Sequence, residues 1–96
     1  MCPTCDEYDV EVIIHGPAQL RRIVEKLKAA VRNQRLLADD ERSGHDMIAQ
    51  VPFLDLDLRE TMPDALSYYM RCSTCDRSFM LCCETYHGSG GKWCRV

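Results

Sequence analysis

The chain is 96 residues long, which is enough for one domain with a modest core that would benefit from an added cross-link or metal ion. Hydrophobic residues make up 46% of it and charged residues 28%, a composition that is typical of a folded domain and too apolar for intrinsic disorder. The formal net charge of −3 excludes a general electrostatic attraction to nucleic acid. We therefore expect a single domain over residues 1–96.

The chain begins with two cysteines, Cys2 and Cys5, in an acidic opening that lacks the basic start and apolar run of a secretory signal. No wholly apolar run is long enough to span a bilayer, so we expect no membrane segment. We therefore expect a cytoplasmic protein. Because the cytosol is reducing, the seven cysteines favour thiolate metal ligands over disulfides.

Residues 8–14 carry the first strand pattern. Tyr8, Val10, Val12 and Ile14 alternate with other side chains, and the segment is rich in β-branched residues. This pattern predicts a half-buried strand.

A helix is predicted to begin at Pro17, because the two residues before it interrupt the strand pattern and proline suits the first helical turn. Apolar residues then recur at helical spacing as far as Val31, which gives the helix an apolar face for packing on a sheet. We expect the helix to end near Leu37, before the polar residues 39–44, which predict a loop.

The charges of the chain are separated along the sequence. Between residues 17 and 38, the single acid Glu25 accompanies six basic residues: Arg21, Arg22, Lys26, Lys28, Arg32 and Arg35. Between residues 39 and 64, eight acids accompany two arginines. The basic part coincides with the predicted helix, and the acidic part follows it.

The second half of the chain contains further strand patterns. Residues 47–58 mix apolar and acidic side chains and predict an edge strand with Pro52 near its start. Residues 66–71 and 79–86 predict an antiparallel hairpin, and residues 92–96 predict a last short strand or a segment whose tryptophan lies against the core.

Two Cys-x2-Cys pairs, Cys2 with Cys5 and Cys72 with Cys75, have the spacing of zinc ligands. Both pairs occur in the motif Cys-x-Thr-Cys-Asp. Each pair can wrap a metal ion in a tight turn, and four thiolates complete a tetrahedral shell with no open position for catalysis. We therefore predict one structural Zn²⁺, against the alternative of four unlinked cysteines that act as small hydrophobic residues.

Turns of this kind are zinc knuckles, and the two pairs resemble those of zinc-ribbon proteins, in which each knuckle lies at the end of a strand. Sixty-six residues separate Cys5 from Cys72, far more than in most ribbons. The predicted fold is therefore an α+β domain in which a mainly antiparallel sheet of three or four strands carries one principal helix on a face. The zinc site joins the amino terminus to the C-terminal hairpin.

The other cysteines, with one nearby histidine, raise the alternatives of a second metal site and of a nucleophile. These residues are Cys82, Cys83, His87 and Cys94. Adjacent cysteines on a strand point to opposite faces, so the simpler interpretation places one in the core and the other on the surface. No motif supplies the orienting group that a catalytic Cys83 and His87 pair would need, and we predict a protein that is not an enzyme.

Two charged surfaces suggest a binding role. The acidic segment can meet a basic protein surface, and its candidate partner-binding residues are Asp40, Glu41, Asp46, Asp55, Asp57 and Glu60. The basic helix can contact phosphates, although it has no aromatic residues on which bases would stack.

The order of cysteine pair, strand, helix and second cysteine pair, followed by Glu84–Gly88 and Trp93, resembles small bacterial immunity proteins of polymorphic (Rhs) or contact-dependent toxin systems. The resemblance implies a non-catalytic protein that binds and neutralises a cognate toxin domain. The alternative is a zinc-ribbon module that binds nucleic acid, or acts in transcription, through the basic helix.

Overall fold

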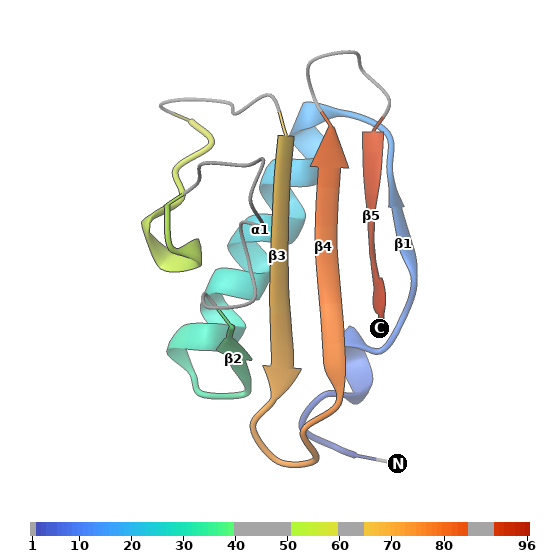
Figure 1. Cartoon of the computed structure of the whole chain (residues 1–96), viewed down its shortest axis with the longest axis vertical. Coiled ribbons are helices and arrows are strands. Elements are labelled where there is room, and N and C mark those ends of the chain that lie inside the picture. Colours follow the sequence, from blue (N-terminus) through green and yellow to red (C-terminus); the bar gives the residue numbers. More distant parts are fainter. Residues whose placement is uncertain (1, 40–50, 60–64, 85–89) are drawn as a thin grey trace.

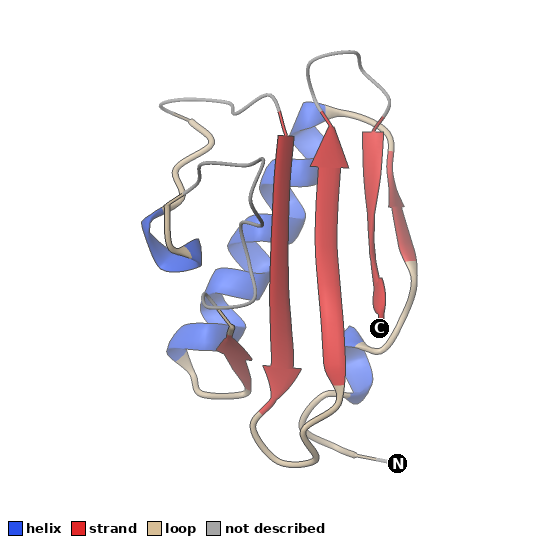
Figure 2. Ribbon diagram, viewed as in Figure 1, coloured by secondary structure: helices blue, strands red, loops and turns tan. Residues whose placement is uncertain are grey.

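A computed structural model describes residues 2–39, 51–59, 65–84 and 90–96 of the chain. Its centre is a five-stranded antiparallel sheet in the order β1-β5-β4-β3-β2, and the helix α1 lies against one face (Figures 1 and 2). In chain order the elements are the 3-10 helix Asp6–Tyr8, β1 (Val12–Ile14), α1 (Pro17–Arg32), β2 (Leu36–Ala38), the 3-10 helix Phe53–Asp55, β3 (Ala65–Cys72), β4 (Ser78–Glu84) and β5 (Gly90–Arg95). The predicted α+β class is confirmed, with five strands instead of three or four.

The core lies between α1 and the sheet. Side chains at helical spacing on α1, among them Leu20, Val24 and Leu27, belong to one buried cluster with the alternate residues of the central strands. Along β3 and β4 nearly every second residue is buried, as expected when one sheet face is covered and the other is not. The buried strand residues in this cluster are Leu66, Tyr68, Met70, Cys72, Phe79, Leu81 and Cys83.

The hairpin of β3 and β4 and the final strand follow the predictions closely. Met70 pairs with Phe79 at one end of the hairpin, and the adjacent cysteines of β4 have different surroundings, since Cys83 is buried while Cys82 is half-buried. In β5, Trp93 is buried and stacks on Phe79 with 5.1 Å between ring centroids. The expected split between one core cysteine and one outward cysteine is therefore observed.

Helix α1 ends at Arg32, five residues earlier than predicted. Gln34 takes a positive φ of 62°, and the Arg35 amide donates to the Ala30 carbonyl at 2.9 Å, which terminates the helix in a left-handed cap. The chain then turns so that Leu36 is fully buried in β2, which pairs with β3. The apolar residues that seemed to prolong the helix form a strand instead.

The strand predicted over residues 8–14 is wrong in its first half. Only Val12–Ile14 form β1, while Tyr8 is buried at the end of a 3-10 helix and Val10 is 58% exposed. The Trp93 indole donates a hydrogen bond to the Tyr8 carbonyl at 2.7 Å, so this backbone group faces a side chain instead of a neighbouring strand.

The edge strand predicted over residues 47–58 is also wrong for the part that the structure describes. Phe53–Asp55 form a 3-10 turn, and Phe53 is fully buried with its ring edge-on to Tyr68 at 5.1 Å. The buried Lys28 of α1 donates a hydrogen bond to the Leu56 carbonyl, which fixes this segment on the helix. The segment therefore covers the core as a compact loop.

Candidate metal centre

The structure brings the four predicted ligands together at one end of the sheet (Figure 1). Cys2 and Cys5 belong to the turn that precedes the first 3-10 helix, Cys72 is the last residue of β3, and Cys75 lies in the turn between β3 and β4. Their four Sγ atoms all lie within 4.8 Å of one another. The N-terminal segment is thus held against the β3–β4 turn.

The shared Cys-x-Thr-Cys-Asp motif folds into two similar turns. In the first, the Asp6 amide donates to the Cys2 carbonyl at 3.0 Å, and in the second the Asp76 amide donates to the Cys72 carbonyl at the same distance. The two turns also touch, because the hydroxyl groups of Thr4 and Thr74 share a hydrogen bond of 2.9 Å. The two copies of the motif therefore form two knuckles that face each other across the site.

One detail of the motif differs from the zinc-ribbon arrangement. The second knuckle leads into β4, but the first leads into the 3-10 helix Asp6–Tyr8 and not directly into a strand. Within the second knuckle, Asp76 has a φ of 63°, and the Thr74 amide points at the Cys72 sulfur at 3.3 Å. Amide hydrogen bonds of this kind support a thiolate ligand.

The spacing of the sulfur atoms fits a single tetrahedral ion. Four sulfurs at about 2.3 Å from zinc would be roughly 3.8 Å apart. The Cys2 and Cys72 sulfurs are 3.7 Å apart, and those of Cys5 and Cys75 are 3.6 Å apart. A disulfide would need about 2.05 Å, and all four cysteines are free. The group therefore has the geometry of a four-cysteine metal site.

Burial and charge also favour a cation here. Cys5 and Cys72 are at most 1% exposed, and Cys2 is 8% exposed, whereas Cys75 is open to solvent. Hydrogen bonding by the backbone N–H of Cys5 lowers the pKa of the Cys2 thiol to about 6, while burial raises the pKa of Cys5 to about 12. Four thiols this close cannot all ionise without a positive charge between them, and a divalent ion supplies it.

Polar contacts outside the cysteines hold the N-terminal segment in place. Arg35 pairs with Glu7 at 2.6 Å, and Arg77 pairs with the half-buried Asp9 at 2.6 Å. The Ser73 hydroxyl donates to the Gln34 carbonyl at 2.6 Å and so joins the second knuckle to the end of α1. Sequence reasoning missed these contacts, although the repeated threonine of the motif was a visible signal for the contact between the knuckles.

The alternative metal group around β4 is not assembled in the residues that the structure describes. Cys82 and Cys83 lie on opposite faces of β4, and Cys94 is half-buried opposite Met80. No group of three or more potential ligands other than the four cysteines occurs in residues 2–39, 51–59, 65–84 and 90–96. His87 lies outside the described residues.

The predicted acidic surface is described only in part. Asp55 is exposed, and Asp57 is half-buried and accepts a hydrogen bond from the Arg59 amide at 3.0 Å. The other four candidates lie outside the described residues, and they are Asp40, Glu41, Asp46 and Glu60.

Comparison of the chain with protein-family models, curated proteins and solved structures finds no match. In the part of the chain that the structure describes, no helix is both long and apolar enough to cross a membrane.

Proposed function

We propose that the chain is a non-catalytic binding protein of the cytoplasm, in which one structural Zn²⁺ held by Cys2, Cys5, Cys72 and Cys75 fixes the shape of the binding surface. The observation that carries the zinc proposal is the sulfur spacing of 3.6 to 3.7 Å between opposite knuckles. A shell of four thiolates leaves no vacancy for a substrate or a reactive water, so the ion stabilises the fold. Zinc and iron share this geometry, and elemental analysis of the purified protein separates them.

The partner that we propose is a cognate bacterial toxin domain, which the chain binds and neutralises as an immunity protein. The acidic segment supports a partner with a basic surface, because charge complementarity speeds association and selects between partners. Within that segment the exposed Asp55 is available for such a contact.

The test is co-expression with the product of the gene immediately upstream. We expect protection of the host cell and a stable one-to-one complex by size-exclusion chromatography. Replacing Asp55 and Asp57 by Lys should slow association by about tenfold at low salt, because rim charges act mainly on the association rate. The matched control is Glu11→Lys, an exposed acid in the N-terminal segment. Absence of both binding and protection would refute the proposal.

A second candidate function is nucleic-acid binding through α1. Arg21, Arg22 and Arg32 are exposed, and none has an ion-pair partner among the described residues. The basic face is smaller than the sequence suggested, since Lys28 is buried and Arg35 is paired with Glu7.

This candidate predicts a salt-dependent shift of labelled DNA or RNA that is lost when Arg21, Arg22 and Lys26 are all changed to Glu. An unchanged shift in that variant would exclude α1 as the contact. The result also discriminates between the two functions, because toxin neutralisation through the acidic segment should survive these substitutions.

A further inference from the structure

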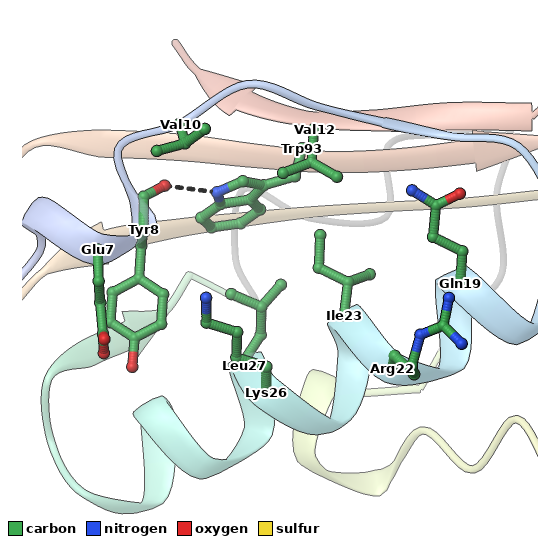
Figure 3. Close-up of a pocket in the computed structure, with 10 residues that line it drawn as sticks. All are labelled: Glu7, Tyr8, Val10, Val12, Gln19, Arg22, Ile23, Lys26, Leu27 and Trp93. Atoms are coloured by element: carbon green, nitrogen blue, oxygen red, sulfur yellow. Dashed lines mark hydrogen bonds between the residues drawn. The ribbon is translucent and has the colours of Figure 1, made fainter.

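A groove of about 410 Å³ runs between α1 and the N-terminal segment, with Trp93 at its base (Figure 3). Its apolar lining consists of Val10, Val12, Ile23, Leu27 and Trp93. The volume lies within the range of about 300 to 1,000 Å³ that is common for small-molecule sites. Apolar surface of this kind loses contact with water when a ligand covers it, which favours binding.

Most polar groups around the groove already have partners. The Trp93 indole N–H donates to the Tyr8 carbonyl at 2.7 Å. Gln19 accepts from the His15 amide and donates to the Ile13 carbonyl, while Glu7 is paired with Arg35. A ligand therefore meets few polar groups that are free to bind it.

The exceptions are two cations on α1. Arg22 and Lys26 line the groove one helical turn apart; Figure 3 shows the Lys26 amino group at the end of the groove near Tyr8 and the Arg22 guanidinium near Gln19. Arg22 has no ion-pair partner in the described residues, and the Lys26 Nζ lies 5.4 Å from the centre of the Tyr8 ring. Both side chains are exposed and cationic, so an anion at the rim of the groove would be attracted by both charges.

We propose that this groove binds a small monocarboxylic acid with an apolar chain, of the size of a medium-chain fatty acid. Its chain would lie against Val12, Ile23 and Trp93, and its carboxylate would lie at the rim between Arg22 and Lys26. Arginine and lysine are suited to this role because charge-assisted hydrogen bonds to carboxylates are stronger than neutral ones. The apolar base supplies affinity, and the two cations select an acid over an alcohol or an amine.

The proposal is independent of the toxin-binding function, because the groove lies on α1 and the N-terminal segment and not on the acidic segment. It does depend on the N-terminal wall of the groove staying in place. That wall follows directly after Cys5 and is anchored by the pair of Arg77 with Asp9.

The test is a titration of the full-length, zinc-loaded protein with octanoate, octanol and octylamine, followed by isothermal calorimetry and by NMR of the ¹⁵N-labelled chain. We expect octanoate to bind at least about tenfold more tightly than the neutral octanol or the cationic octylamine. The largest shifts should occur at the Trp93 indole N–H and at the amides of Val12 and Ile23.

Arg22→Gln with Lys26→Gln should weaken octanoate binding by at least about tenfold, with only a small change in the melting temperature from the lost contact of Lys26 with the Tyr8 ring. The matched controls, Arg21→Gln and Arg32→Gln, change exposed arginines of the same helix that do not line the groove and should bind octanoate as the unmodified chain does. Ile23→Trp, which fills the groove, should abolish binding. Absence of octanoate binding, equal affinity for octanol, or shifts elsewhere in the protein would overturn the proposal.

Discussion

Replacing Cys75 with Ser should cost the protein about as much stability as replacing Cys72 with Ser. The two residues differ in burial, since Cys72 is 1% exposed and Cys75 is open to solvent. If the four cysteines only packed, the exposed one would be replaced at little cost. If they bind one ion, each substitution removes a ligand and releases the metal, so the two variants should behave alike.

The expected loss is about 4 kcal/mol when free zinc exceeds its dissociation constant a thousandfold, because the ion binds only the folded chain. Native mass spectrometry should find one zinc in the unmodified protein and none in either variant, and thermal denaturation should give similar, lowered midpoints. Cys82→Ser is the matched control, as Cys82 is a half-buried cysteine on β4 outside the cluster. A Cys75→Ser protein that keeps its zinc would contradict the proposed ligand set.

The same site should lose its metal as the pH falls. Burial raises the pKa of Cys5 to about 12, so near neutral pH this thiol is protonated without the ion and must give up its proton when the ion binds. Metal binding therefore releases protons and weakens in acid. The zinc-dependent part of the stability should be largest at neutral to alkaline pH and should disappear on acidification, which denaturation over a pH series can measure.

The sequence was most informative where one physical constraint determines a pattern. The alternation from Leu66 to Cys83 reflects a sheet with one covered face, and it placed both strands of the hairpin correctly. The spacing of Cys2, Cys5, Cys72 and Cys75 reflects the geometry of tetrahedral thiolate coordination. In both cases the constraint that shapes the structure also fixes the spacing of residues along the sequence. The hairpin and the metal ligands could therefore be predicted without knowing the fold.

Predictions failed where tertiary contacts decide the backbone conformation. The end of α1 depends on the positive φ of Gln34. A glycine at this position would have signalled such a conformation in the sequence, but a glutamine does not. Phe53 and Leu56 are both buried because Phe53 begins a 3-10 turn, Leu56 ends it, and Lys28 donates a hydrogen bond to the Leu56 carbonyl; a strand would place residues three apart on opposite faces. The groove could not be predicted from the sequence, since Trp93 and Ile23 are far apart in the chain and only the folded structure brings them to one groove.

Replacing Gly91 with Ala should strongly destabilise the sheet. Gly91 of β5 pairs with Ile14 of β1 and with Cys83 of β4, so it lies between two neighbouring strands. A β-carbon at this position would overlap the Cys82 carbonyl oxygen and would lie 2.8 Å from the β-carbon of Cys83. Two of the nearest atoms belong to the backbone, so the strands must separate to make room.

We expect a loss of about 3 kcal/mol or more in the free energy of unfolding, at or above the upper end of the cost of overpacking. The sign is informative, because alanine in place of glycine otherwise stabilises a strand by restricting the unfolded chain. Gly16→Ala is the matched control, since nothing lies within 4 Å of a β-carbon there, and its effect should stay within about 1 kcal/mol. Urea denaturation followed by Trp93 fluorescence measures both variants, and equal stability of the two would show that β4 and β5 do not approach as closely as described.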